Sequence, residues 1–598
     1  MSKVTTTQLM RRTKELRRIV LGDVSGEELW KHIEYFSKIV RVSGTQGERE
    51  ALEYICENLR SYGIDPEVYE FDSYVSIPVT AELMILSPVT KAIQAITHSF
   101  AAPTSADGIE GHLVFVESEG RTEDPLLASI NAEPYSKLDV EGKMTLVEGI
   151  ASPTKLFAAE DAHAAAQIHI SSEPMPHEMI VTTIWGTPTP SSAGRIPRIP
   201  AASVGEQDGR FLQDLCRKGT VRIRLKTIVD TGWRKLALPV ATIRGRDGAG
   251  HFVLIGGHYD SWHVGVTDNA TGDATLLEIA RVMQKHRKAL HRSVKVAWWP
   301  GHSVGRFSGS TWFADNLFDD LNKHAVAYVN IDSPGCKGNT MYDLEVMAEA
   351  SALTTRVVKE VTHAKFKLSR PGRWGDMSFW GLGFPSIECM SMAQPDNRAN
   401  VGGSGGGWWW HTPEDTLDKA DYDVEVRDTK LNLAIVLAIC NAHIIPWNFG
   451  ELAEQYIRNL NELQSSAHGH FDFEQLTAKA RQLKTQGSRL RRAALSSETE
   501  EGKAAEKKVA QINETYLRLS RVLIPALFTR TGRYDQDPAI QGPLLPSLRD
   551  VAKLASGKLT ADERGFLLTH LVRERNRTSD ALNQALLLVR DCLAEIKC

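Results

Sequence analysis

The chain of 598 residues has few cysteines and lacks any long apolar run. No two cysteines are separated by only two residues, so we expect neither a disulfide framework nor a zinc site of paired cysteines. The seven cysteines are scattered: Cys56, Cys216, Cys336, Cys389, Cys440, Cys592 and Cys598. No stretch approaches the roughly 18 apolar residues that cross a bilayer, and the first twenty residues lack the apolar core of a secretory signal. These absences predict a cytoplasmic protein with no membrane partner.

An excess of charge of either sign is also absent. The chain carries 70 Lys and Arg against 74 Asp and Glu, which gives a net charge of -4 and an isoelectric point near 6.6. A nucleic-acid partner is not expected, because proteins that bind nucleic acid usually present a basic surface. The hydrophobic content of 42% and the charged content of 24% are typical of globular domains, and the length predicts several of them.

Two separated segments, 20–76 and 236–445, predict a single α/β domain. In the first segment, Ser25 and Glu28 form a predicted capping box before an apolar helical stripe, and a second helix is expected over 47–62. In the second segment, apolar strands alternate with helical patterns, which is typical of a mostly parallel sheet.

The other two segments differ from this domain, and from each other, in their predicted secondary structure. Residues 77–235 predict an inserted domain of short strands and turns around a compact strand–helix–strand unit. Residues 446–598 are mainly helical, with apolar stripes at 509–523 and 582–593 whose spacing of three and four residues predicts a buried helix face. We expect part of that surface to contact a second copy of the chain.

Histidines and aspartates stand at the ends of predicted strands. A strand over 252–256 is followed by His258 and Asp260, and Asp268 lies at the expected start of a helix. A second strand ends in Asp332, and His411 follows a glycine-rich run. Functional side chains of open α/β sheets gather at the carboxyl ends of the strands. Imidazole and carboxylate ligands suit zinc, manganese or iron, so this order predicts a metal site.

Another motif, Gly-x-Ser-x-Gly, lies at 301–305 after a predicted strand. Strand, motif and helix in this order are typical of the nucleophile elbow of serine hydrolases, with Ser303 as the nucleophile. Such an enzyme also needs an acid and a histidine farther along the chain, and the best candidates for both already belong to the metal pattern. We therefore keep the serine hydrolase as the alternative to a metal mechanism.

The ordered motifs H-x-D, D-N-x-x-G, N-x-D-S and H-T-P-x-D-T resemble the co-catalytic zinc exopeptidases, which include aminopeptidases, glutamate carboxypeptidase II and the transferrin receptor. Residues 142–171 resemble the protease-associated domain of that group, and residues 511–554 resemble its helical dimerisation domain. Residues 373–387 resemble its S-D-H-x-x-F-x-x-x-G-I-P segment, with Asp376 at the acid. The resemblance implies a mixed sheet flanked by helices, an inserted protease-associated-like domain, a C-terminal helical domain and a homodimer.

The resemblance also implies roles for the strand-end residues. His258 and Asp332 would hold one metal ion, Asp268 would bridge two ions, and His411 would hold the second. Asp260 would orient a ligand, which agrees with its position two residues after His258 in an extended segment.

The chain departs from the family where the catalytic acids should stand. The family has W-x-x-E-E-x-G-L-x-G-S, but no carboxylate occurs from Pro300 to Ala314, and the chain is one residue longer there. His302 is placed to replace a glutamate as metal ligand or as general base. The other interpretation is that His302 only caps a turn in a degenerate site.

We therefore predict a metal-dependent hydrolase of amide or peptide-like bonds, with Asp260 and His302 as catalytic residues. It would use one or two divalent transition metal ions, zinc foremost, and a small or short peptide-like substrate. The alternatives are a non-catalytic binding protein like the transferrin receptor and a non-hydrolytic metal enzyme such as a lyase or oxygenase. Candidate substrate contacts are the arginines and tryptophans near the site, each with an ordinary structural role as the alternative: Arg306, Arg370, Arg373, Trp408, Trp409 and Trp410.

Overall fold

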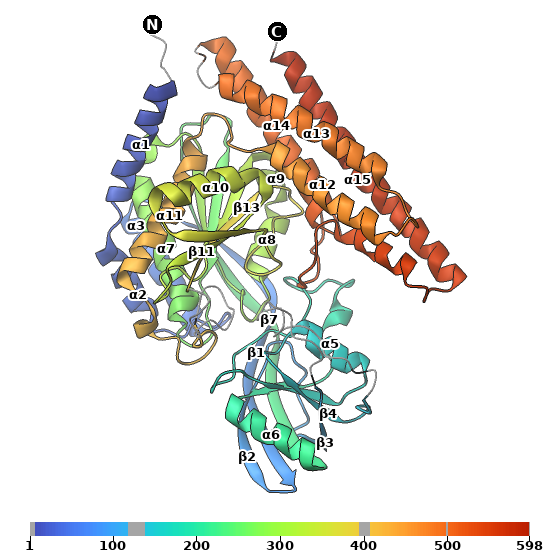
Figure 1. Cartoon of the computed structure of the whole chain (residues 1–598). Coiled ribbons are helices and arrows are strands. Elements are labelled where there is room, and N and C mark those ends of the chain that lie inside the picture. The colour runs from blue at the N-terminus through green and yellow to red at the C-terminus, as the bar shows by residue number, and fades with distance from the viewer. Residues whose placement is uncertain are drawn as a thin grey trace.

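The structure is a computed structural model that describes residues 6–117, 135, 138–393, 407–497, 500 and 502–596. Cys598 lies outside the described residues. Figure 1 shows three parts: an α/β part around a large sheet, a β-rich part below it, and a bundle of long helices beside it. The predicted α/β class, a mixed sheet flanked by helices with a helical C-terminal region, is confirmed.

The central sheet runs in the order β7-β9-β8-β10-β13-β11-β12. Its strands are β7 Val221–Ile243, β8 Phe252–His258, β9 Ser293–Trp299, β10 Ala325–Asn330, β11 Met341–Val346, β12 Lys365–Ser369 and β13 Ser386–Met392. Strands β9, β8, β10 and β13 are parallel to one another, whereas β7 pairs antiparallel with β9 and β11 pairs antiparallel with β13. The four parallel strands bring their carboxyl ends to one edge, where sites form in sheets of this kind.

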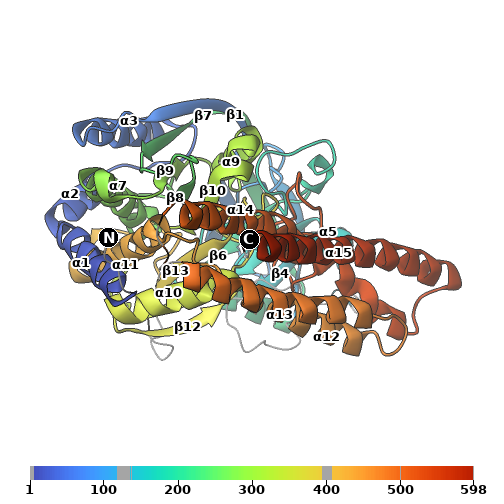
Figure 2. The same ribbon diagram turned by 90° about the horizontal axis from the view of Figure 1, so that it is seen from above.

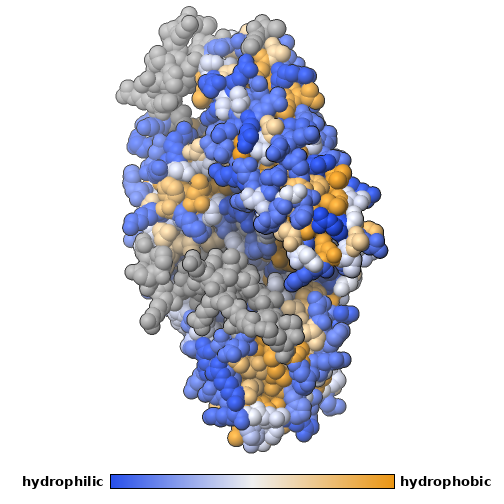
Figure 3. Space-filling view, turned by 45° about the vertical axis from the view of Figure 1, so that its right-hand side comes forward, coloured by the Kyte–Doolittle hydropathy of each residue, from blue (hydrophilic) through white to orange (hydrophobic). Residues whose placement is uncertain are grey.

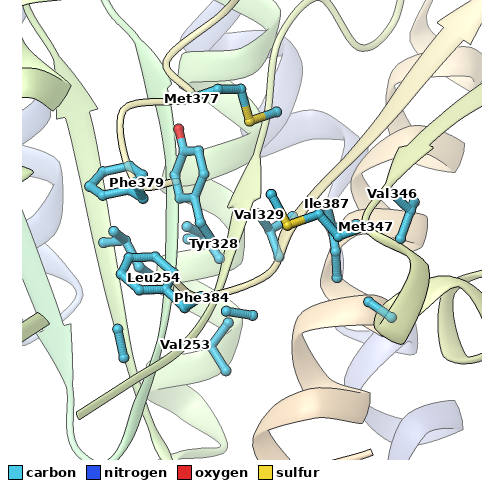
Figure 4. Close-up of a cluster of buried hydrophobic side chains, with 14 of the residues drawn as sticks. Val253, Leu254, Tyr328, Val329, Val346, Met347, Met377, Phe379, Phe384 and Ile387 are labelled. Atoms are coloured by element: carbon cyan, nitrogen blue, oxygen red, sulfur yellow. The ribbon is translucent and has the colours of Figure 1, made fainter. Parts of the chain in front are cut away.

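Helices and a buried apolar cluster support this sheet. The flanking helices are α1 Thr6–Gly22, α2 Gly26–Phe36, α3 Gln46–Ser61, α7 Thr271–Lys285, α8 Ser308–Asn316, α9 Phe318–His324, α10 Ala348–Val361 and α11 Tyr422–Asn441. Figure 4 shows Leu254 of β8 and Tyr328 of β10 packed with Phe379 and Phe384, all of them buried. The rings of Tyr328 and Phe379 lie 4.6 Å apart, so β10 is fixed from its side chains as well as from its backbone.

The predicted capping box of α2 is only half formed. The hydroxyl of Ser25 accepts the backbone N–H of Glu28 at 3.2 Å. The N–H of Ser25, however, donates to the carboxylate of Glu278 at 2.6 Å rather than to Glu28. A carboxylate from α7 therefore replaces the local partner and ties the start of α2 to that helix.

The inserted part contains the predicted strand–helix–strand unit, in which β4 and β5 are parallel neighbours. Its elements are β2 Lys91–Thr97, β3 Ile109–Phe115, β4 Met144–Glu148, α5 Pro153–Asp161, β5 Ala166–Ile170, β6 Ala201–Val204 and α6 Glu206–Lys218. The expectation that the insert contains only short strands is wrong, because a long strand, β1 or β7, lies at each end of the insert. Strand β1 Glu67–Ser87 pairs antiparallel with β7 from Glu67 to Ser87, and the two long strands run from the α/β part into the insert (Figure 1). The bounds of the domains stay a prediction.

Long helices form the described C-terminal part, and Figure 2 shows them from above. They are α12 Phe449–Ser466, α13 Glu474–Ser497, α14 Lys503–Phe528 and α15 Ala561–Glu595. The predicted stripe from Val509 to Leu523 lies on the buried face of α14, and α14 packs against α15. Short 3-10 helices occupy Ala193–Arg195, Arg287–Ala289, Leu417–Lys419 and Pro546–Ala555.

The outer surface is mostly polar. Figure 3 shows one face that is largely hydrophilic, with smaller hydrophobic patches between the charged side chains. Within the described ranges, no helix has the length and apolarity that crossing a membrane would require.

Candidate metal centre

His258 is the last residue of β8, and its ring is buried beside two aspartates. Its Nδ1 contacts the backbone carbonyl of Asp260 at 2.9 Å, so the neutral ring carries its proton there and presents Nε2 to the site. That Nε2 lies 2.9 Å from Oδ1 of Asp268 and 3.6 Å from Oδ1 of Asp332. Burial lowers the pKa of His258, but the facing carboxylates, Asp332 first, outweigh it and raise the pKa well above its ordinary value.

Asp268 lies between two imidazoles. Its Oδ1 faces His258, and its Oδ2 lies 3.1 Å from Nε2 of His411. Burial raises the pKa of this carboxyl, but its contacts with the two histidines offset that effect and hold the pKa well below its ordinary value. One carboxylate with an oxygen toward each histidine is the arrangement that bridging two metal ions requires.

His302 follows β9 and completes a cluster with His258 and Asp332. One ligand atom from each of these three residues lies within 4.8 Å of the others. The ring of His302 stacks on that of His258, with centroids 3.8 Å apart and planes 15° apart. Its Nδ1 lies 2.9 Å from Oδ2 of Asp376, whose Oδ1 accepts the hydroxyl of Ser310 at 2.7 Å. His302 therefore lies beside two of the predicted metal ligands.

Asp260 fixes the segment that carries His302. Its two carboxylate oxygens accept the backbone N–H groups of His302 at 3.2 Å and of Ser303 at 2.9 Å. Asp260 is fully buried and also lies 3.5 Å from Nδ1 of His258. One aspartate thus joins the loops that follow β8 and β9, while its role in orienting a metal ligand stays a prediction.

Ser303 lacks the partner that the serine-hydrolase alternative needs. Its side chain is buried, and in the part of the chain that the structure describes, no histidine hydrogen bonds to its hydroxyl. A serine nucleophile is activated by an adjacent base, so this geometry favours the metal mechanism.

Two residues of the insert, His177 and Glu178, fix the position of His411 and its neighbour Trp410. The sequence analysis did not predict this support. Nδ1 of His411 donates to the backbone carbonyl of Glu178 at 2.6 Å, and the N–H of Glu178 donates back to the carbonyl of His411 at 2.9 Å. His177 contacts the carbonyl of Trp410 at 2.5 Å, and the ring of Trp410 stacks on His411 with centroids 3.6 Å apart. No local motif marks Glu178, because its backbone makes the contact and any residue type offers the same groups.

Asp415 holds the loop that carries Asp268. Its carboxylate accepts the N–H of Thr267 at 2.9 Å, the hydroxyl of Thr267 at 2.8 Å and the N–H of Asp268 at 3.1 Å. Burial raises the pKa of Asp415 to about 7. The H-T-P-x-D-T motif contains this residue, so the sequence carried a signal for its role that the residue prediction did not use.

A buried guanidinium group, that of Arg41, hydrogen bonds to the backbone of the loop between β8 and Asp268. Arg41 comes from the segment between α2 and α3 and is fully buried. It donates to the backbone carbonyls of Tyr259 at 2.9 Å, Val264 at 2.9 Å and Gly265 at 3.1 Å. An arginine of this type offers several donors in fixed geometry, and here they satisfy carbonyls that a tight loop leaves unpaired.

The predicted substrate arginines both contact the C-terminal part. Arg370 donates to the carbonyl of Gly542 at 2.6 Å, and Arg373 donates to that of Asp537 at 2.6 Å. The guanidinium of Arg373 also lies 3.8 Å from the ring centroid of Trp185. No described contact joins Arg370 to the metal-centre residues, and its hydrogen bond links it to the 537–542 segment. Substrate binding by Arg370 stays a prediction.

The donor atoms of this centre fit a divalent metal ion. Nε2 of His258 is buried without an acceptable hydrogen-bond partner in the described structure, although two carboxylates stand close to it. The same carboxylates raise the pKa of His258, and a divalent cation would replace the proton on Nε2 and accept electron pairs from the imidazole and the carboxylates. Imidazole and carboxylate ligands in a group of three or four are typical of zinc sites.

Comparison with known proteins supports the same assignment. Residues 240–436 match peptidase family M28. The chain is 21% identical to the probable glutamate carboxypeptidase AMP1 of Arabidopsis thaliana, over 53% of this chain and 52% of that protein, so it spans about half of that relative.

Two solved structures share the fold. One is a peptidase M28 precursor from Shewanella amazonensis, with a TM-score of 0.57, 20% identity, and coverage of 72% of this chain and 97% of that one. The other is BSAP, a zinc aminopeptidase from Bacillus subtilis, with a TM-score of 0.52, 19% identity, and coverage of 69% and 94%. The match, the fold and the ordered strand-end residues agree: residues 240–436 of this chain match peptidase family M28, and these similarities support the resemblance to the co-catalytic zinc exopeptidases.

Proposed function

We propose that the protein is a metal-dependent hydrolase of peptide-like bonds in which His302 replaces the missing glutamate pair. The observation that carries this proposal is the convergence of His258, His302 and Asp332 within 4.8 Å, beside an aspartate that faces both His258 and His411. One or two divalent ions would bind there, with zinc foremost and manganese or iron as alternatives. Such an ion polarises a carbonyl group and lowers the pKa of bound water.

The position of His302 favours a role as metal ligand over a role as general base, because one of its ring nitrogens lies within 4.8 Å of ligand atoms of His258 and Asp332. Asp376 accepts a hydrogen bond from Nδ1, so the neutral ring presents the electron pair of Nε2. A ligating histidine in proteins usually donates its other N–H to a carboxylate in this way. His258, Asp332 and His302 would then hold one ion, and His411 and Asp268 would hold the second.

Peptide-like substrates are proposed from the relatives. The matched relative is a probable glutamate carboxypeptidase, and the structural neighbours include a zinc aminopeptidase. A homodimer through the C-terminal helices belongs to the same proposal, because α15 leaves large apolar side chains such as Phe566 and Leu587 exposed.

Elemental analysis of the whole protein, purified without chelator and then supplied with zinc, manganese or iron, tests the metal site. We expect the wild type to hold at least one ion per chain, and His258→Ala and Asp268→Ala to hold far less. A wild type that retains none of the three metals would support the non-catalytic alternative. A wild type that holds metal but cleaves no member of a dipeptide library would support a non-hydrolytic metal enzyme.

A further inference from the structure

Arg306 is a partly buried cation without an anionic partner. In the described part of the chain, its side chain makes no hydrogen bond or ion pair, and its Nε is buried and unpartnered. Burial and the nearby positive charge of Arg373 lower the pKa of Arg306 to about 10, which leaves it charged at neutral pH. A buried charge is costly unless an opposite charge or hydrogen-bond acceptors compensate it.

Arg373 is a second cation in the same place. It is 7% exposed, its Nε is also buried and unpartnered, and no described carboxylate lies within ion-pair distance of it. It donates to one backbone carbonyl, that of Asp537, and lies over the ring of Trp185. The positive charges of the partly buried Arg306 and the buried Arg373 repel each other, and among the described residues only Arg373 has a nearby opposite charge, that of Asp537. An anion between the two guanidinium groups would relieve the repulsion.

The two arginines adjoin the metal centre through aromatic side chains. The guanidinium of Arg306 lies 5.1 Å from the ring centroid of Phe307, and that ring lies 4.8 Å from the ring of His302. The ring of Phe307 also lies 4.2 Å from that of Trp185, on which Arg373 rests.

Backbone and side-chain hydrogen bonds fix this group. The N–H of Gly186 donates to the carbonyl of Arg306 at 2.6 Å. The indole of Trp185 donates to Ser378 at 2.9 Å, and Ser378 contacts Ser310, which donates to Asp376. The insert therefore holds both arginines in a defined position relative to His302.

We propose that Arg306 and Arg373 form a subsite that binds a carboxylate group of the substrate beside the metal centre. Counted from Trp299, Arg306 stands at the leucine of the family pattern W-x-x-E-E-x-G-L, so the subsite is a feature of this chain rather than of that pattern. The proposal deepens the proposed function, because it assigns acidic peptide-like substrates to the same site.

Binding of glutarate to the 598-residue chain tests the subsite without turnover. Glutarate carries two carboxylates, glutaramide is its neutral counterpart, and inorganic phosphate is the competing anion. Titration calorimetry on chelated protein separates this subsite from direct coordination of glutarate by metal. We expect glutarate to bind at least tenfold more tightly than glutaramide, because loss of one desolvated charge contact weakens binding by about that factor or more.

Variants locate the binding. Arg306→Gln should weaken glutarate binding by roughly tenfold or more, and Arg306→Lys should retain part of it, because the charge remains but the planar fork is lost. Arg222→Met, at an exposed arginine of β7, is the matched control and should bind as the wild type does. Circular dichroism identifies any variant that does not fold, and the comparison of glutarate with glutaramide on the wild type needs no variant.

Three results would overturn the proposal: equal binding of glutarate and glutaramide, tighter binding of phosphate than of glutarate, or unchanged glutarate binding in folded Arg306→Gln. Failure of the hydrolase proposal gives a different pattern, in which glutarate binds through Arg306 but acidic dipeptides are not cleaved by metal-loaded protein.

Discussion

The imidazole Nδ1 of His302 and the carboxylate Oδ2 of Asp376 lie 2.9 Å apart. Ser310 donates to the other oxygen of Asp376, so the carboxylate is held from two sides and in turn holds the ring. His302 stands where the family has a glutamate, and Asp376 lies 74 residues farther along the chain. In this pair, His302 differs from the glutamate of the family pattern, whereas Asp376 lies in the 373–387 segment that resembles the family.

Replacing Asp376 by Asn should weaken metal binding while the fold persists. The amide has nearly the same shape but no charge, so His302 loses the partner that fixes its proton on Nδ1. Loss of such a partner typically costs 10- to 100-fold in metal affinity, which competition with a chromogenic chelator measures. Ser310→Ala is the milder control, because it removes only one contact to Asp376. An unchanged affinity in Asp376→Asn would show that His302 does not ligate metal.

Activity should depend on His302 and not on Ser303. If His302 is a ligand, His302→Ala lowers metal content and turnover together. If it is a general base, metal content stays and turnover falls by about 10²–10⁴-fold. Ser303→Ala should have a mild effect, and a fluorophosphonate should not label the protein.

His302→Glu is the sharper variant of this series. It restores one family carboxylate, and we expect it to retain metal without ordinary aminopeptidase activity, because Ser303 leaves the second carboxylate missing. Metal content and turnover of the three variants are measured side by side. An inactive Ser303→Ala variant together with an active His302→Ala variant would contradict the metal mechanism and support the serine-hydrolase alternative.

A charge on the exposed face of α15 should disrupt the proposed homodimer. Leu587 is 47% exposed and lines a hollow between α13 and α15. Leu587→Glu should shift the molecular mass toward that of the monomer in light scattering, because an interface that buries this leucine cannot solvate a carboxylate. Val89→Glu, at an exposed apolar position of the insert, is the control. A wild type that is monomeric at micromolar concentration would exclude the dimer.

Glu349 should make stability depend on pH. Both of its carboxylate oxygens are buried without a hydrogen-bond partner among the described residues, and burial raises its pKa from 4.5 to about 7. Between these pH values the folded state keeps a proton that the unfolded state has released, so this contribution to stability falls as pH rises from 4.5 and is lost above 7. The loss is of order 1–3 kcal/mol.

Glu349→Gln should remove this pH dependence. Thermal unfolding is compared at pH 4.5 and pH 8, and the variant should gain in Tm over the wild type at pH 8 but hardly at pH 4.5. Glu53→Gln, at an exposed glutamate of α3, should show no such difference. Equal differences at both pH values would mean that Glu349 is already ionised in the folded protein.

Several contacts at the metal centre join residues far apart in sequence, which limited what could be predicted. The candidate ligands His258, Asp268 and Asp332 could be selected because parallel strands end at one edge and these residues follow such ends. His411 was selected from the H-T-P-x-D-T motif. The support of His411 by Glu178 spans 233 residues and uses backbone atoms that no residue type reveals. The same limit explains the half-formed capping box, in which Glu278 of a distant helix takes the N–H of Ser25.

The sequence by itself determined the α/β class and the order of the candidate ligands at strand ends, because periodicity and residue type are local properties. Comparison with the pattern of the family that the chain resembles showed that the glutamate pair is missing. Only the tertiary structure decided that His302 lies on His258 with Asp376 behind it, and that Arg306 and Arg373 share one buried place. Those relationships depend on how β8 and β9 pair and on where Trp185 of the insert packs against Phe307. The free energy that fixes them comes from burial and hydrogen bonds between distant segments, which no local pattern records.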